Sequence, residues 1–286
     1  MLKDICILIV GIGSVGSPLA EEFAKLGIGH IILVDHDRID IANVIRHMAG
    51  ISDIGRYKTL FMAERILNKN PYAHVEPYQI RAFKKNEELI RSLVKQCDVA
   101  VGSLDDRKDR LFLNRLCVEE NKQLIIPGVG QRAHDCQILF VKEPRVTPCY
   151  NCFVTFLPQM DEDREISSPE QAQKIAYADK DVPIEPGLSI DIMPVVTMSA
   201  KLIVTELLKN KPNTMKSLEE DLIAPWWMYL NRREVGTDFE KLKPLGFNIG
   251  DGPHILSWWG IDLERNPACP TCGDYVGEMT KKYGIK

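Results

Sequence analysis

The sequence lacks any apolar run that approaches the ~20 residues needed for a membrane-spanning helix. It also lacks a strong excess of charge of either sign, because 36 Lys and Arg face 40 Asp and Glu, a formal net charge of −4. General nucleic-acid binding depends on many Lys and Arg contacts to phosphate, so this balance argues against such a function. The N-terminus carries Asp4 and leads directly into a strand-like stretch, which is not typical of a signal peptide. We therefore expect a cytoplasmic protein with no membrane partner.

Low-complexity segments and internal repeats are also absent. With 286 residues, 45% hydrophobic and 27% charged, the chain has the composition of a folded globular protein. Through the first half, strand-like segments alternate with helix-like segments. The expected strands cover 5–10, 31–34, 75–80, 99–101 and 124–126, and the expected helices cover 18–26, 58–67, 86–95 and 109–120. This alternation predicts an α/β fold with a Rossmann-like, doubly wound and mostly parallel sheet.

The second half shows weaker patterns. Residues 159–186 are rich in charge, Ser and Pro and indicate a long, mobile crossover loop, whereas 190–209 indicate a buried helix that contains Pro194. We interpret the four tryptophans of the tail as a small C-terminal core, with a partner-binding surface as the alternative. They are Trp226, Trp227, Trp258 and Trp259. The expected organisation is a core over 1–158 and the loop over 159–186. Residues 187–286 are then expected to form a helix that completes the core, followed by a small subdomain.

Cysteine is missing from 159–268, although the chain has eight cysteines. Four of them form two Cys-x-x-Cys pairs, Cys149 with Cys152 and Cys269 with Cys272. This is the spacing of zinc ligands, and four thiolates leave no open position, so we expect a structural zinc site that links the tail to the core. A redox role for one pair is the alternative, but it would leave the other pair unexplained. The remaining cysteines are expected to be structural residues: Cys6, Cys97, Cys117 and Cys136. For Cys136, a role near the site is the alternative.

A glycine-rich turn, Gly11-Ile12-Gly13-Ser14-Val15-Gly16, lies between the first expected strand and the first expected helix. In the dinucleotide-binding pattern, Gly11 makes the tight turn, Gly13 lets the backbone approach a phosphate, and Gly16 lets the helix pack close to the strand. Asp35 ends the second strand, where a carboxylate can bind ribose hydroxyls. The pattern alone does not distinguish NAD, FAD and ATP.

The residues after Asp35 favour a nucleoside triphosphate. Asn43, Arg46 and Lys58 supply groups that an NAD enzyme does not need here but that can neutralise phosphates as pyrophosphate departs. Asp105 follows the strand at 99–101, so it should lie above the carboxyl ends of the strands, where ligands bind in open α/β sheets. A carboxylate in that place can hold Mg²⁺ that bridges phosphates.

Together these residues resemble the ThiF/MoeB/HesA family, the bacterial relatives of ubiquitin-activating enzymes. The matching segments are the turn from Gly11 to Gly16, Val34-Asp35-His36-Asp37, Asn43-x-x-Arg46, Asp53-Ile54-Gly55-x-x-Lys58, Asn70-Pro71, Asp105 with Arg110, and the two Cys-x-x-Cys pairs. They cover about residues 5–155, and the resemblance resumes after Gly187 and at Cys269.

The resemblance implies an adenylyltransferase that uses Mg-ATP to adenylate the C-terminal carboxylate of a small ubiquitin-like or sulfur-carrier-like protein. Residues 1–158 would then be the ATP-binding adenylation core. Asp35 would bind the ribose, and Asn43, Arg46 and Lys58 would bind the phosphates. Asp105 would ligate Mg²⁺, and Arg46, Lys58 and Asp105 would be the catalytic residues. A carboxylate is already ionised at neutral pH, so positioning and charge neutralisation suffice and no general base is needed.

Two features depart from the family pattern. Ubiquitin-activating enzymes carry a cysteine in or after the long loop that takes the partner as a thioester, and this chain has none there. We therefore expect the adenylate to pass to a conjugating enzyme or another acceptor protein. Many members also reach the neighbouring subunit's site with an N-terminal arginine. Either Arg107 or Arg110 replaces it here, or the chain is one domain of a longer protein. A homodimer is expected, because members of the family are commonly dimers.

Three alternatives stay open at the level of the sequence. Adenylation could act on a peptide, a small carboxylate or a tRNA base, although the near-neutral charge weighs against tRNA. An NAD- or FAD-dependent oxidoreductase would need only the glycine turn and Asp35, and would leave Arg46, Lys58 and Asp105 without a role. A non-catalytic scaffold subunit would not need the intact set of phosphate-binding residues.

Overall fold

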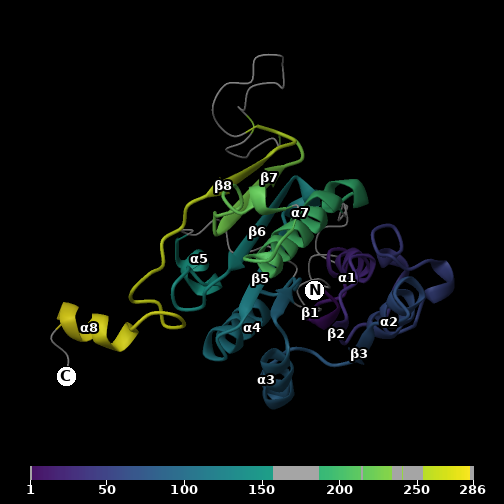
Figure 1. Ribbon diagram of the computed structural model, residues 1–286, viewed down its shortest axis with the longest axis horizontal. Coiled ribbons are helices and arrows are strands. Elements are labelled where there is room, and N and C mark those ends of the chain that lie inside the picture. The colour runs from purple at the N-terminus through teal and green to yellow at the C-terminus, as the bar shows by residue number, and fades with distance from the viewer. Residues whose placement is uncertain (1, 157–186, 214, 234–239, 241–253, 284–286) are drawn as a thin grey trace, which may run out of the picture.

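The computed structural model describes residues 2–156, 187–213, 215–233, 240 and 254–283. Its centre is one eight-stranded sheet in the order β3-β2-β1-β4-β5-β6-β7-β8 (Figure 1). The first five strands are parallel, and the last three are added antiparallel. The strands are β1 Cys6–Val10, β2 His30–Val34, β3 His74–Tyr78, β4 Val99–Gly102, β5 Gln123–Val129, β6 Asp135–Val141, β7 Trp226–Leu230 and β8 Trp258–Ile261.

Helices cover both faces of this sheet and give three layers (Figure 1). One face packs against α1 (Gly16–Lys25), α2 (Lys58–Lys69) and α7 (Ser189–Leu208). The other face packs against α3 (Glu87–Gln96), α4 (Arg107–Glu119) and α5 (Tyr150–Phe156). The last helix, α8 (Tyr275–Tyr283), lies at the end of the C-terminal tail, away from the sheet (Figure 1).

β1 shows why the sequence forms a central strand. All five of its residues are buried, and successive side chains point to opposite faces. Ile7 and Ile9 join the core beneath α1 and α7, whereas Leu8 and Val10 join the core beneath α3 and α4. Such a continuous apolar run is typical of a parallel strand covered on both sides. The carboxyl end of β1 therefore emerges between two packed layers, where the glycine turn begins.

The prediction of an α/β fold with a Rossmann-like sheet is confirmed. Every strand and helix expected in the first half is present, with ends shifted by at most three residues. The helix expected over 190–209 is α7, and Pro194 lies inside it. The expected loop over 159–186 lies outside the described residues, so the division at 158 and 186 stays a prediction.

The interpretation of the tryptophans as a separate small core is wrong, because all four lie on β7 and β8 of the main sheet. Trp226 and Trp227 lie on β7, which pairs with β6 in the main sheet. Because neighbouring side chains of a strand face opposite sides, Trp226 packs into one layer of the main core and Trp227 into the other. In the part of the chain that the structure describes, no helix is long and apolar enough to cross a membrane.

Candidate functional site

The glycine turn joins β1 to α1, and two of its glycines have no room for a side chain. Gly11 has φ of +93°, and a Cβ there would lie 2.2 Å from the carbonyl oxygen of Ser103 after β4. A Cβ on Gly16 would lie 1.9 Å from the carbonyl oxygen of Gly11. A Cβ on Gly13 would meet nothing within 4 Å, so this residue borders open space. The three positions therefore fit the tight turn, the close helix packing and the open approach that the sequence predicts.

Asp35 is held at the end of β2 by the backbone. One carboxylate oxygen accepts a hydrogen bond from the amide of Ile12 at 2.6 Å, and the other accepts one from the amide of Asp37 at 2.8 Å. The carboxylate is buried but lines a cavity. It is thus fixed against the glycine turn and keeps lone pairs to accept hydrogen bonds from a ligand.

His47 is a residue to which the sequence analysis assigned no role, although it stands directly after Arg46. Its Nδ1 accepts from the amide of Ala49 at 3.0 Å, so its Nε2 carries the proton and donates to the carbonyl of Ile12 at 2.8 Å. Burial lowers the pKa of His47, and nearby Lys58 acts in the same direction. The neutral imidazole therefore holds the glycine turn through the carbonyl of Ile12, whereas Asp35 holds it through the amide of the same residue.

A cavity of about 490 Å³ lies at the carboxyl ends of the parallel strands. Its walls come from the glycine turn, the ends of β1 and β2, the segments after β3 and β4, and the end of β5. This volume is within the range of small-molecule sites. Of the predicted binding residues, the cavity is lined by Gly11, Gly13, Asp35, Asn43, Arg46, Lys58 and Asp105. Gly16 lies beneath it in the contact between turn and helix.

The cationic side of the cavity comes from Arg46 and Lys58. Within the described residues, the Arg46 guanidinium makes no hydrogen bond or ion pair. The Lys58 ammonium donates to Asp37 at 2.8 Å, which leaves two of its protons for a ligand. Burial opposes ionisation of Asp37, but Lys58 holds the pKa of Asp37 below its usual value. On this side of the cavity an anion would therefore meet Arg46, which has no partner among the described residues, and Lys58, which is shared with Asp37.

The acidic side comes from residues around the start of α4. The exposed carboxylate of Asp105 has no hydrogen bond or ion pair to the described part of the chain. Asp106 caps α4 through the amide of Lys108 at 2.7 Å. Arg81, which follows β3, bridges Asp106 at 3.3 Å and Asp109 at 2.9 Å. Asp105 is thus the acid of this group that stays uncommitted.

The contact of Arg81 with Asp109 is a part of the cavity wall that the sequence analysis missed. Asp109 is buried, and burial raises the pKa of Asp109 although Arg81 acts against this shift. Its second carboxylate oxygen has no partner among the described residues. Only the tertiary fold brings Arg81 and Asp109 together, so no local sequence pattern predicted their contact.

Cys136 lies outside the cavity lining, on β6. Its thiol contacts the carbonyl of Asp191 at 3.3 Å and the amide of Asn231 at 3.7 Å. Burial raises the pKa of Cys136 to about 12, and a buried thiol of that kind is not a reactive nucleophile. These contacts agree with the expected structural role.

The two Cys-x-x-Cys pairs come together although they are far apart in the sequence. Cys149 and Cys152 at the start of α5 face Cys269 and Cys272, and all four are buried. Three of the sulfur–sulfur distances are 3.4, 3.7 and 4.0 Å, and all four sulfurs lie within 4.8 Å of one another. Four sulfurs at ~2.3 Å from one tetrahedral zinc ion would be roughly 3.8 Å apart. The cluster therefore has the composition and the spacing of a structural zinc site.

The sheet topology, the glycine turn and the carboxylate at the end of β2 define a Rossmann-type α/β protein. Residues 1–224 match the family model described as the ThiF family, and the chain belongs to this family.

Curated relatives carry names of modifier-activating and carrier-activating enzymes. The chain is 27% identical over 159 residues to Ubiquitin-like modifier-activating enzyme 5 of Caenorhabditis elegans, covering 53% of this chain and 38% of that protein. It is 31% identical over 168 residues to Adenylyltransferase and sulfurtransferase UBA4 of Lodderomyces elongisporus, covering 58% and 35%. The chain thus spans little more than a third of either relative. It is 27% identical over 278 residues to Sulfur carrier protein adenylyltransferase of Thermus thermophilus, covering 96% and 84%.

Among solved structures, the fold is similar to that of E. coli MccB. The TM-score is 0.67 at 19% identity, covering 96% of this chain and 66% of the MccB chain. A structure of MccB with ATP gives a TM-score of 0.65 at 18% identity, covering 96% and 68%. At these identities the similarity supports the fold alone.

Proposed function

We propose that this chain is an ATP-dependent adenylyltransferase that activates the C-terminal carboxylate of a small ubiquitin-like or sulfur-carrier-like protein. One observation carries the proposal: the cavity of this ThiF-family chain holds an uncommitted cation, Arg46, and an uncommitted carboxylate, Asp105. In the proposal Arg46 receives a phosphate and Asp105 receives the metal ion that accompanies it. An oxidoreductase with a dinucleotide would use neither group.

The remaining residues then take their roles from their positions. Asp35 accepts hydrogen bonds from ribose hydroxyls, and the open backbone at Gly13 faces a phosphate. Asn43, Arg46 and Lys58 bind the phosphates. Asp105 would hold Mg²⁺, which would supply further charge neutralisation.

The reaction needs an incoming carboxylate held in line with the bond that breaks. A carboxylate oxygen of the partner forms a bond to the α-phosphorus, and the bond to the departing pyrophosphate breaks. No proton has to be removed, because the carboxylate is ionised at neutral pH. Arg46 and Lys58 stabilise the negative charge that moves to the leaving group.

The acyl adenylate would then leave for an acceptor on another protein. No cysteine lines the cavity within the described residues, and Cys136 is buried with a raised pKa. We therefore propose no thioester on this chain and assign the next step to a conjugating enzyme or another acceptor protein. A homodimer, a cytoplasmic location and a zinc ion on the four clustered cysteines belong to the same proposal.

ATP–pyrophosphate exchange tests the function with the protein fraction of a source-cell lysate as the carboxylate donor. We expect exchange that requires this fraction and that disappears when the fraction is first treated with carboxypeptidase. Asp105→Asn should lower the exchange on the order of 100-fold, the loss expected when one charge-stabilising group is removed. Asp4→Asn, at an exposed aspartate outside the cavity lining, is the matched control and should exchange like the wild type.

Three results would contradict the proposal. Exchange that survives carboxypeptidase treatment would favour a small carboxylate over a protein C-terminus. Calorimetric binding of NAD in preference to Mg-ATP would favour the oxidoreductase, and Mg-ATP binding without any exchange would favour a scaffold subunit.

A further inference from the structure

A cluster of two histidines and one glutamate lies at the edge of the sheet formed by β2 and β3. Nε2 of His30 is 2.7 Å from Oε1 of Glu76, and Nε2 of His74 is 3.3 Å from the same oxygen. The two imidazole rings are 4.7 Å apart between centroids. The side chains of His30 and Glu76 are each 26% exposed and that of His74 is 68% exposed. The three ligand atoms are thus within reach of solvent.

The strand register explains why these side chains meet. His30 and His74 are paired neighbours on parallel strands, and Glu76 is two residues after His74. Side chains two apart on a strand share a face, so all three point to one side of the sheet. This is the side on which Ile32 joins the core beneath α3 and α4. The sheet itself therefore fixes the spacing of the cluster.

A second hydrogen bond orients the glutamate. Tyr78, two residues further along β3, donates its hydroxyl proton to Oε2 of Glu76 at 2.6 Å. This contact turns Oε1 toward both histidines. Carboxylate ligands in metal sites are commonly oriented by such an outer hydrogen bond.

We propose that His30, His74 and Glu76 bind a divalent transition-metal ion of the Zn²⁺ class, with water in the remaining positions. Two imidazole nitrogens and one carboxylate oxygen are a ligand set that zinc accepts with an open fourth position. Ligands at ~2.1 Å from one ion lie roughly 3.0–3.4 Å apart, close to the 2.7 and 3.3 Å measured here. The two imidazole nitrogens disfavour Ca²⁺, which takes oxygen ligands almost exclusively.

The proposed site is separate from the adenylation cavity and from the cysteine cluster. His30 and His74 are the first residues of β2 and β3, whereas the cavity lies at the opposite ends of these strands. None of the three ligands lines the cavity. The inference therefore does not depend on the proposed function, and it can fail or hold without it.

Metal titration of the zinc-filled protein tests the site. Wild-type protein is loaded with zinc, passed over gel filtration to remove loosely bound ions, and titrated with Zn²⁺ by calorimetry. We expect one further equivalent to bind. Titration with Co²⁺ should give weak d–d absorption bands without the thiolate charge-transfer bands that binding to the cysteine cluster would produce.

Substitutions test whether the further equivalent of Zn²⁺ binds at these three residues or elsewhere on the protein. His74→Gln and Glu76→Gln should weaken binding of the further equivalent at least tenfold, and Tyr78→Phe should weaken it by about 10–100-fold through the outer hydrogen bond. Added Zn²⁺ should raise the thermal midpoint of the wild type more than that of His74→Gln. His36→Gln is the matched control, because His36 is also an exposed imidazole beside a carboxylate, and it should bind like the wild type.

Three results would overturn the proposal: no further equivalent in the wild type, unchanged affinity in His74→Gln and Glu76→Gln, or loss of binding in His36→Gln. Circular dichroism without added metal checks that each variant is folded. If Glu76→Gln does not fold, His74→Gln decides the question, because its ring is 68% exposed on the edge strand of the sheet.

Discussion

At the scale of single residues, Gly13 and Gly16 form a matched pair within one turn. Gly16→Ala would place its Cβ 1.9 Å from a backbone oxygen, whereas Gly13→Ala would place its Cβ in open space. We expect Gly16→Ala to destabilise the fold by about 1–3 kcal/mol, the usual cost of overpacking. Gly13→Ala should keep its stability and lose about tenfold in ATP affinity, because its methyl group occupies the phosphate approach. Urea unfolding and calorimetry measure the two effects, and unchanged ATP affinity in Gly13→Ala would place the phosphates elsewhere.

His47 gives a prediction about pH. Burial lowers the pKa of His47 in the folded state below the ~6.5 of an exposed histidine. Between these two pKa values the unfolded chain binds more protons, so the stabilisation is complete above pH ~6.5 and is lost as pH falls. We expect the unfolding free energy of His47→Gln to depend less on pH between 6.5 and 5.5, by at most about 1.4 kcal/mol per pH unit. Urea unfolding at several pH values measures it, and a His47→Gln slope equal to that of the wild type would contradict this role of His47.

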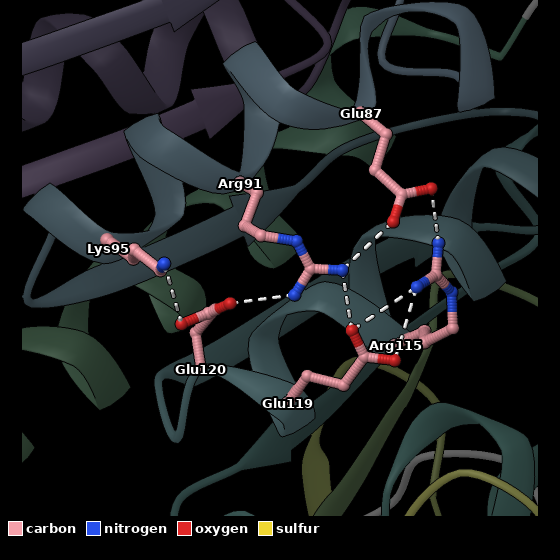
Figure 2. A network of polar contacts seen from close by, with 6 residues as sticks. All are labelled: Glu87, Arg91, Lys95, Arg115, Glu119 and Glu120. Atoms are coloured by element: carbon pink, nitrogen blue, oxygen red, sulfur yellow. Dashed lines mark hydrogen bonds and ion pairs between the residues drawn. The ribbon is translucent and has the colours of Figure 1, made fainter.

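At the scale of elements, α4 begins two residues after Asp105, and a network of ion pairs connects it to α3 (Figure 2). Arg91 on α3 donates to Glu87 of its own helix and to Glu119 and Glu120 at the end of α4, at 2.7–2.9 Å. Arg115 of α4 reaches back to Glu87 at 2.8 Å. Arg91 and Arg115 thus each join the two helices.

We expect Arg91→Met to lower the thermal midpoint by about 2–4 °C at low salt, and this difference should shrink in 1 M NaCl because salt screens exposed charges. Lys95→Met is the control. Lys95 makes a single 3.7 Å contact in the network and is 60% exposed, so its removal should change little. Scanning calorimetry at two salt concentrations measures both, and a salt-independent loss in Arg91→Met would point to packing of its aliphatic stem instead.

The elements also show how far the sequence could predict the structure. The parallel strands and their helices were predictable because apolar runs and helix periodicity are local signals. The glycine turn, Asp35 and Asp105 followed from the rule that ligands bind at the carboxyl ends of such strands. The placement of Trp226 and Trp227 in the main sheet was not predictable, because antiparallel pairing of β7 with β6 is a contact between distant segments. The contact of Arg81 with Asp109 is hidden for the same reason.

At the scale of the whole molecule, the cysteine cluster joins α5 to the C-terminal tail across 120 residues of sequence. A hydrogen bond from Asn151 to Thr271 at 3.1 Å crosses the same gap. If zinc holds the cluster, its ligand bonds supply most of the attachment, since structural zinc sites contribute directly to folding.

We therefore expect one tightly bound zinc per chain after gel filtration and none in Cys269→Ser. Limited proteolysis should then cut the variant within residues 262–283, while the sheet and the cavity stay folded, because the cluster lies outside the cavity lining. Cys6→Ala, at a buried cysteine outside the cluster, is the control and should keep its zinc. Elemental analysis and mass spectrometry of the fragments measure both effects. Full zinc content in Cys269→Ser would mean that the four sulfurs are neighbours without being ligands.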